Sequence, residues 1–287
     1  MKIEKSKILK NYTTFRIGGK ADFFVDAKSI IDVLKAKEFA KSKKIPLVVI
    51  GKGSNILIGN KGFRGLVLKI NYKDCHTEKN RITCGAGISL AQLLSLARDY
   101  NLGGAEFLAG IPGTLGGAVA GNAGTGSKSI SQIVESVKIL KNNGLIIKAK
   151  PSYFNFGYRE SKIKKEKDII LEATLSLKKS DKKKIKNKIK NILKKRKNQP
   201  KEFSAGSVFK NPKNYYAGEL IAKAGLQGES RGKAQISKEH GNFIINLGKA
   251  KTEDVKYLIK KIQKKVMNKF GVQLNREIRF LEEKGWR

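Results

Sequence analysis

The apolar positions in the first half of the chain alternate between the spacing of helices and that of strands. A helix is predicted from Ser29, a good N-cap residue, to about Lys43, because apolar residues recur there every three or four positions. A second helix, SLAQLLSLARDY, starts at a capping box formed by Ser89 and Gln92 and ends at the glycines after Asn101. Short apolar runs predict the strands PLVVI (46–50), ILIG (56–59), GLVLKI (65–70), VESVKIL (134–140) and DIILEATLSL (168–177).

The pattern changes at SDKKKIKNKIKNILKKRKNQP, residues 180–200. Its isoleucines form one stripe among lysines, which predicts an amphipathic helix that connects two domains. A strand (GNFIINL, 241–247), a long helix capped by Thr252 and a last strand (REIRFLE, 276–282) follow. The predicted organisation is a domain of residues 1–179, a helical connection of 180–200 and a smaller domain of 201–287.

Length and composition place the chain among globular proteins. With 287 residues, of which 40% are hydrophobic, it can bury a sizeable core. No apolar run is long enough to span a bilayer, and the N-terminus lacks the apolar core of a secretion signal, so we expect a cytoplasmic protein without membrane insertion. The two cysteines, Cys75 and Cys84, have neither CxxC spacing nor a nearby histidine cluster, so we expect no metal site and assign the cysteines no role.

A formal net charge of +37 suggests an anionic partner. Nucleic acid is one such partner, because clustered Lys and Arg displace counterions from phosphate. The excess is mostly Lys, however, and it is spread along the chain without interleaved aromatic residues; there is one Trp. A solvated basic surface explains this pattern, and we expect no specific nucleic-acid binding.

Two glycine-rich segments carry the strongest candidate chemistry. GKGSN (51–55) follows the first predicted buried strand, and GIPGTLGGAVAGNAG (110–124) follows the second helix. Neither contains the GxxxxGK[ST] or GxGxxG fingerprint of the common nucleotide-binding loops. Bare backbone of this kind serves tight turns or brings N–H groups close to phosphate oxygens. Two such segments in one domain favour a large ligand that contains a diphosphate.

Eight sequence blocks follow one another along the chain: TTFRIGGKADFF (13–24), IGKGSNILI (50–58), AEFLAGIPGTLGGAVAGNAG (105–124), GYRES (157–161), SAGSVFKNP (204–212), AGLQG (224–228), ISKEHGNFIIN (236–246) and NREIRFLE (275–282). In content and order they resemble the UDP-N-acetylenolpyruvoylglucosamine reductases. They cover nearly the whole chain, which lacks the inserted substrate loop of the longer members and so resembles their compact subgroup. The resemblance implies an α+β architecture: an FAD-binding fold of p-cresol methylhydroxylase type, with two subdomains, followed by a smaller α/β substrate-binding domain.

By this resemblance the glycine-rich segments bind FAD non-covalently. NADPH would be the co-substrate, and UDP-N-acetylglucosamine enolpyruvate would be reduced to UDP-N-acetylmuramate in peptidoglycan precursor synthesis. The enzyme would act as a cytoplasmic NADPH-dependent flavoprotein, with a monomer favoured. The residues that the resemblance assigns to the cofactor are Gly51, Gly53, Ser54, Asn55, Pro112, Gly113, Thr114, Gly117, Asn122 and Gly124.

The resemblance also assigns three catalytic residues, which come from distant segments. Hydride addition to the enolpyruvyl group leaves negative charge next to a carboxylate, so the site needs a cation and a proton donor. Arg159 would be the cation, Ser207 the proton donor, and Glu277 would orient or polarise the substrate. From the residues alone, each has a plain structural reading: a surface arginine, a serine after a glycine turn and an exposed carboxylate.

Three further residues would contact the substrate by resemblance: Tyr158, Lys210 and Asn211. A cation and an amide donor suit the diphosphate of a UDP sugar, although a solvated turn before Pro212 would also explain Lys210 and Asn211. Two other functions remain as alternatives. One is a flavin oxidoreductase of the same fold with another substrate, and the other is nucleic-acid binding, suggested by the charge.

Overall fold

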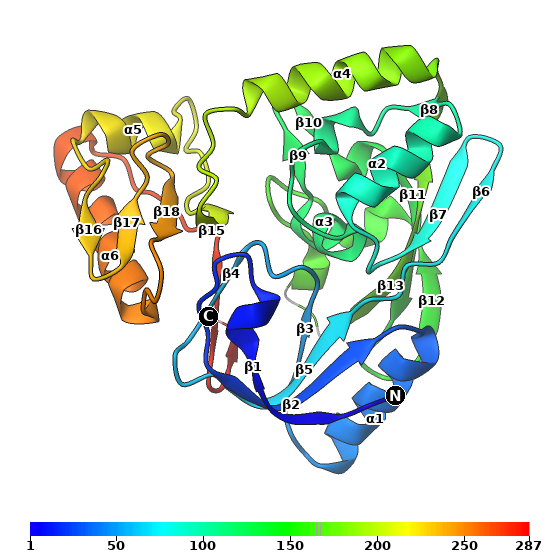
Figure 1. Ribbon diagram of the computed structural model, residues 1–287. Coiled ribbons are helices and arrows are strands. Elements are labelled where there is room, and N and C mark those ends of the chain that lie inside the picture. Colours follow the sequence, from blue (N-terminus) through cyan, green and yellow to red (C-terminus); the bar gives the residue numbers. More distant parts are fainter. Residues whose placement is uncertain (165, 167, 287) are drawn as a thin grey trace.

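Three packed regions make up the molecule in the computed structural model, which describes residues 1–164, 166 and 168–286. Figure 1 shows a first lobe in blue, a second lobe in cyan and green, and a C-terminal domain in yellow to orange. The chain returns at its end to the first lobe, where the red strand lies. Within the described residues, no helix is both long and apolar enough to cross a membrane.

The first lobe is a mixed sheet covered by one helix. The sheet has the order β1-β2-β5-β3, with β1 antiparallel to β2 and the other pairs parallel. Ser29 caps the helix, as predicted, by accepting a hydrogen bond from the Asp32 N–H. The elements are β1 (Glu4–Ile8), β2 (Lys20–Ala27), α1 (Ile30–Ser42), β3 (Leu47–Ile50) and β5 (Phe63–Ile70).

The second lobe is an antiparallel sheet with helices on one side. The sheet order is β12-β11-β13-β7-β6, and the predicted capping box of Ser89 and Gln92 is present at the start of α2. Small ladders complete the lobe: β8 with β14 and β9 with β10. The elements are β6 (Cys75–Glu78), β7 (Arg81–Gly85), α2 (Leu90–Asp99), β8 (Leu102–Gly103), α3 (Leu115–Gly121), β9 (Gly124–Thr125), β10 (Lys128–Ser129), β11 (Val134–Leu140), β12 (Ile146–Ala149), β13 (Ile169–Ser176) and β14 (Lys178–Lys179).

The lysine-rich segment forms helix α4 (Lys182–Lys195), as its isoleucine stripe predicts. Figure 1 shows it lying across the second lobe, near α2. Ile185 is buried, and Ile189 and Ile192 pack at the edge of the core that both lobes share. The helix therefore rests on the second lobe through its apolar stripe, while its lysines remain in solvent.

The C-terminal domain packs two helices on a four-stranded antiparallel sheet of order β15-β18-β17-β16. Helix α6 starts at Thr252, so the predicted cap is one residue too late: Lys251 occupies the N-cap, and the Thr252 hydroxyl instead donates to the Ile58 carbonyl at 2.9 Å. The elements are β15 (Phe203–Ser207), α5 (Ala217–Lys223), β16 (Ser230–Arg231), β17 (Ala234–Ile236), β18 (Phe243–Asn246) and α6 (Thr252–Phe270).

A final segment ties this domain to the first lobe. Strand β19 (Arg279–Glu282) pairs in parallel with β4 (Ile56–Ile58) and antiparallel with β20 (Gly285–Trp286). Ile278 and Phe280 of this segment enter the core. Short 3-10 turns fill other connections: η1 (Leu9–Tyr12), η2 (Glu106–Leu108), η3 (Ile130–Gln132), η4 (Pro151–Phe154) and η5 (Lys162–Lys164).

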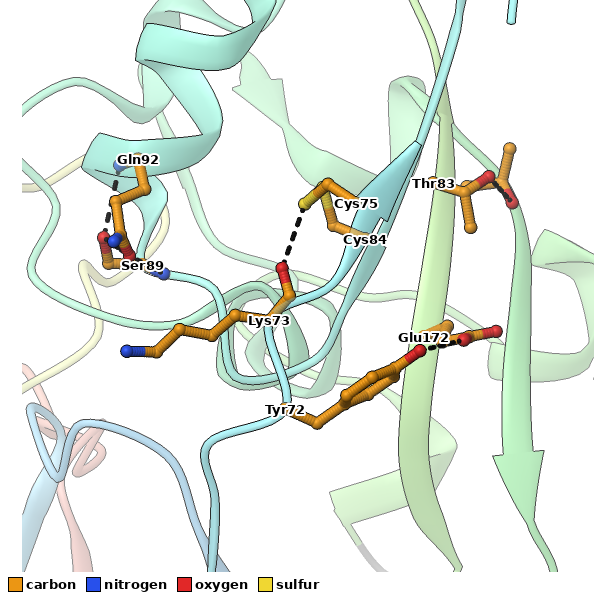
Figure 2. Close-up of a disulfide and its surroundings, with 9 residues drawn as sticks. Tyr72, Lys73, Cys75, Thr83, Cys84, Ser89, Gln92 and Glu172 are labelled. Carbon is orange, nitrogen blue, oxygen red and sulfur yellow. Dashed lines mark hydrogen bonds between the residues drawn. A yellow bond between two sulfur atoms is a disulfide. The ribbon is translucent and has the colours of Figure 1, made fainter. Parts of the chain in front are cut away.

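The cysteines correct one expectation, because they form a disulfide between β6 and β7. Cys75 lies directly opposite Cys84 in this antiparallel pair, with 4.2 Å between their Cα atoms. Figure 2 shows the bond at the start of the hairpin, near the Tyr72–Glu172 hydrogen bond. The spacing of nine residues matches no redox or metal motif, so only the strand register could have revealed the pairing.

Candidate functional site

A cavity of about 570 Å³ lies between the two N-terminal lobes. Strand β3 contributes one wall, with Val48 and Ile50, and helix α3 and strand β13 contribute the other, with Gly117 and Ile170. Its volume is in the range of small-molecule and cofactor sites. The core that both lobes share lies behind these walls, so the two sheets hold the cavity open between them.

The two glycine-rich segments meet at this cavity. A Cβ atom at Gly51 would lie 2.4 Å from the Thr114 hydroxyl oxygen, and one at Gly113 would lie 3.6 Å from the Ser54 hydroxyl oxygen. Thr114 caps α3 by accepting a hydrogen bond from the Gly117 N–H at 3.3 Å. The strand-to-strand turn 51–55 and the start of α3 therefore face each other with backbone exposed.

The residues at this cavity fit FAD. A Cβ at Gly117 would meet only the Thr114 hydroxyl oxygen, at 3.4 Å, so the backbone there has room for a ligand. Cations line the same cavity, among them Lys164 and Arg279. Bare amides together with cations suit a diphosphate, and the apolar walls suit the aromatic rings at either end of a dinucleotide.

Arg159 and Glu277 form an ion pair, with 3.3 Å between Nε and Oε1. Arg159 lies in a tight turn of the second lobe in which Gly157 and Glu160 exchange backbone hydrogen bonds of 3.0 and 3.1 Å. Glu277 precedes β19 in the C-terminal segment. The guanidinium also donates from Nη2 to the Gly124 carbonyl at 2.8 Å, so it joins the glycine-rich segment to the C-terminal segment.

Ser207 lies next to this pair, at the end of β15. The Glu277 N–H donates to the carbonyl of Val208, the following residue, at 2.8 Å. A Cβ at Gly206 would lie 3.8 Å from the Ser54 carbonyl oxygen, which places the strand end against the 51–55 turn. Thus three residues separated by 48 to 118 positions in the chain come to one place, beside the predicted cofactor segments.

Burial shapes the ionisation of this cluster. Desolvation raises the pKa of the Glu277 carboxyl, against the opposing effect of Arg159, Lys164 and Lys210. Desolvation also lowers the pKa of Lys164 to about 8, with repulsion from Arg279 in the same direction. The site therefore concentrates positive charge around one carboxyl group that accepts a proton more readily than usual.

The predicted substrate residues flank the cluster. Lys210 pairs with Glu160 at 2.6 Å, which links the C-terminal domain to the turn that carries Arg159. Tyr158 is 54% exposed, and the Arg159 guanidinium lies 5.4 Å from its ring centre. The Asn211 side chain accepts a hydrogen bond from the Ala217 N–H at 3.0 Å, so its oxygen holds the loop before α5.

Several of the predicted cofactor residues make contacts within the protein. The buried Asn122 donates to the Gly157 carbonyl at 2.9 Å and accepts from the Ser131 N–H at 3.2 Å. Gly124 sits in a narrow hairpin, where a Cβ would lie 2.0 Å from the Lys128 carbonyl oxygen. Both residues connect the glycine-rich segment to the Arg159 turn. Pro112, Gly53 and Asn55 lie in the two facing segments, and the Asn55 amide donates to the Glu277 carbonyl at 3.2 Å.

Three cations near the site were not predicted from sequence. Lys164 and Arg279 line the cavity, and Arg279 stacks on Trp286 at 4.1 Å. Arg196, at the end of α4, has a buried Nε atom without a hydrogen-bond partner among the described residues. Lys164 belongs to a lysine-rich run, where nothing in the sequence separates it from the exposed Lys162. Their position depends on tertiary packing.

Comparison with protein families divides the chain into two parts. Residues 21–150 match the FAD binding domain family. Residues 199–281 match the C-terminal domain of UDP-N-acetylenolpyruvoylglucosamine reductase. The first match covers both glycine-rich segments, and the second covers Ser207, Lys210 and Glu277.

Whole-chain relatives carry the same name. UDP-N-acetylenolpyruvoylglucosamine reductase from Clostridium novyi is 40% identical over 284 residues, which cover 98% of this chain and 92% of the relative. The enzyme from Caldanaerobacter subterraneus subsp. tengcongensis is 40% identical over 286 residues, 99% and 95% of the two chains. The crystal structure of the Thermus caldophilus reductase superposes with a TM-score of 0.84 at 34% identity, and covers 98% of this chain and 99% of that one. The predicted fold class is confirmed.

Proposed function

The chain belongs to the UDP-N-acetylenolpyruvoylglucosamine reductases, and we propose that it reduces UDP-N-acetylglucosamine enolpyruvate to UDP-N-acetylmuramate with NADPH. It is an oxidoreductase with FAD as its cofactor, and its role lies in peptidoglycan precursor synthesis. Bound between the two glycine-rich segments, FAD would supply hydride transfer from NADPH to the enolpyruvyl group. The observation that carries the proposal is the Arg159–Glu277 pair, which lies beside Ser207 and the two glycine-rich segments.

Arg159 holds the substrate carboxylate and the negative charge that the reaction places next to it. Its contacts to Gly124 and Glu277 fix the plane of the guanidinium and use Nη2 and Nε. No contact of Nη1 is found among the residues that the structure describes, and its N–H groups would bind a carboxylate. Because a guanidinium keeps its proton at any physiological pH, the positive charge is present throughout the reaction.

Ser207 supplies the proton that completes the reaction. The carbon that becomes negatively charged is a strong base, so a hydroxyl is acidic enough to protonate it. A neutral donor also adds no charge beside the cofactor. Within the described residues, no other protein group hydrogen-bonds the Ser207 hydroxyl, and its side chain is partly exposed.

Glu277 orients the reacting end of the substrate. Burial raises the pKa of its carboxyl, which makes the protonated form more accessible than at the surface. In that form it donates a hydrogen bond to a substrate oxygen, and in the ionised form it keeps Arg159 aligned. Lys210, Tyr158 and Asn211 lie on the solvent side, where Lys210 suits the diphosphate of the UDP sugar.

Ser207→Ala tests the assignment by separating the two half-reactions. Reduction of bound FAD by NADPH should stay near normal, whereas reoxidation by the enolpyruvyl substrate should slow by about 10²–10⁴-fold, because only this step needs the proton. Anaerobic stopped-flow absorbance of the flavin measures both rates. Ser204→Ala in the same strand is the matched control, with both rates unchanged. Equal loss in both half-reactions of Ser207→Ala would remove the serine from proton transfer.

A further inference from the structure

Arg159 occupies a backbone conformation that arginine rarely adopts. Its φ is 59°, and it is the third residue of the Gly157–Glu160 turn. A turn with positive φ at its third residue favours Gly or Asn at that position, because a side chain there is strained. Such strain persists only where surrounding contacts hold it, and it is common at functional sites.

The turn is fastened at both ends to the glycine-rich segment. The Asn122 side chain donates to the Gly157 carbonyl at 2.9 Å, and the buried Ser161 hydroxyl donates to the Ala120 carbonyl at 2.6 Å. These contacts fix where the turn starts and where it ends. They leave the Arg159 carbonyl without a contact, whereas the N–H of the same peptide, that of Glu160, donates to the Gly157 carbonyl at 3.1 Å.

Lys164 makes that missing contact. Its ammonium donates to the Arg159 carbonyl at 2.5 Å, from the 3-10 turn η5, and its side chain also lines the cavity between the lobes. Desolvation lowers its pKa to about 8, so the fold keeps a charged group where charge is disfavoured. The titratable groups that act on it are Arg279, Lys210, Glu277 and Glu160; the two cations oppose its charge and the two carboxylates favour it.

We propose that Lys164 is a positioning residue of the reduction, which holds the strained Arg159 backbone so that the guanidinium meets the substrate carboxylate. This inference rests on the proposed function. Lys164 acts through Arg159 and takes no part in the chemistry itself. The Lys164 side chain lines the cavity and also binds the Arg159 carbonyl. A change in the cavity wall at Lys164 would therefore move the catalytic cation.

The first test compares Lys164→Met with Lys164→Arg. Met keeps the length of the side chain but loses the donor and the charge, whereas Arg keeps both. Misplacing a binding group by about 1 Å can cost about 10²-fold, so Met should slow flavin reoxidation by the enolpyruvyl substrate by roughly 10–100-fold. The rate of flavin reduction by NADPH should not change, and Arg should restore most of the loss. Lys162→Met, an exposed lysine of the same turn, is the matched control.

The second test is a double-mutant cycle with Arg159→Lys, measured on the reoxidation step. If Lys164 acts through Arg159, Lys164→Met should cause little further loss once the guanidinium is absent. Fully additive losses would overturn the proposal, as would normal reoxidation in Lys164→Met. Loss of FAD from Lys164→Met, with normal chemistry after FAD is restored at saturating concentration, would also overturn it and make Lys164 a cofactor ligand.

A third measurement needs no substrate and so separates this inference from the proposed function. Amide hydrogen exchange at Gly157 and Glu160 reports opening of the turn. Exchange at these amides should be at least several-fold faster in Lys164→Met than in the wild type or in Lys162→Met. Faster exchange in Lys164→Met, together with a wild-type enzyme that fails to reduce the enolpyruvyl substrate, would leave the support role standing and refute the function. Unchanged exchange would refute the support role. Should Lys164→Met not fold, Lys164→Gln replaces it in all three measurements.

Discussion

The glycine-rich segment 110–124 and the charged cluster around Arg159 differ in how they are built. The segment exposes bare backbone, and its polar side chains Thr114 and Asn122 make contacts within the protein. The cluster consists of charged side chains from distant segments, held by an ion pair and by single hydrogen bonds. The first region depends on local sequence and close packing, and the second on tertiary assembly. Substitutions should therefore affect stability and cofactor binding in one region, and catalysis in the other.

After Ser207→Ala, the largest effect is expected in the same cluster, for Arg159→Lys. An ammonium cannot replace the contacts to Gly124 and Glu277 while it also grips a carboxylate. Reoxidation of the flavin by substrate should slow by about 10²–10³-fold, with FAD content and unfolding temperature close to normal. A variant with near-normal turnover would exclude Arg159 from the reaction. A variant that loses FAD would contradict the proposal that the cluster serves catalysis and the glycine-rich segment serves cofactor binding.

Removal of the disulfide should have the next largest effect, on the stability of the second lobe, which forms one wall of the cavity. It closes a short loop across β6 and β7 in the second lobe. Loop-closure entropy for such a loop is worth roughly 2–3 kcal/mol, so a reductant should lower the unfolding temperature by about 5–10 °C. The Cys75→Ala, Cys84→Ala double variant should show the lower temperature without reductant and no further change with it. A change in the ratio of the two half-reaction rates would contradict a role of the disulfide in stability alone.

Two neighbouring glycines of α3 sharpen the comparison within the glycine-rich segment. A Cβ at Gly116 would lie 2.7 Å from the Ala86 Cβ, whereas one at Gly117 would meet only the Thr114 hydroxyl oxygen, at 3.4 Å. Gly116→Ala should destabilise the FAD-free protein by about 1–2 kcal/mol through overpacking. Gly117→Ala should leave its stability unchanged but weaken FAD binding, because the added methyl points into the cavity. Thermal unfolding without FAD and FAD titration by fluorescence distinguish the two. If both variants lost stability and FAD affinity to the same extent, close packing alone would explain why glycine occupies both positions.

The same contrast explains what sequence could predict. Local patterns gave the strands and helices, including the Ser29 cap and the Ser89–Gln92 capping box. The glycine-rich segments were visible because their composition is unusual. Lys164 was not, because a buried lysine and a solvated one look the same in a run of lysines. The disulfide escaped for a related reason: it depends on the register of β6 and β7, which no spacing motif encodes. Arg159, Ser207 and Glu277 were assigned by family resemblance, since sequence does not show that distant segments meet.

The smallest effect concerns the pH dependence of stability at Lys164. Burial lowers the pKa of this ammonium to about 8 from an ordinary value of 10.5, so the charged form is disfavoured in the fold. Below pH 8 the full penalty is present, and it declines as pH rises from 8 to 10.5, where only the unfolded chain still binds the proton. Met does not titrate, so the stability of the wild type relative to Lys164→Met should rise between pH 8 and pH 10.5, by roughly 2–4 °C in unfolding temperature for about 1 kcal/mol. Thermal unfolding of both proteins across this pH range measures the change. A difference that stays constant over this range would contradict the burial of the ammonium.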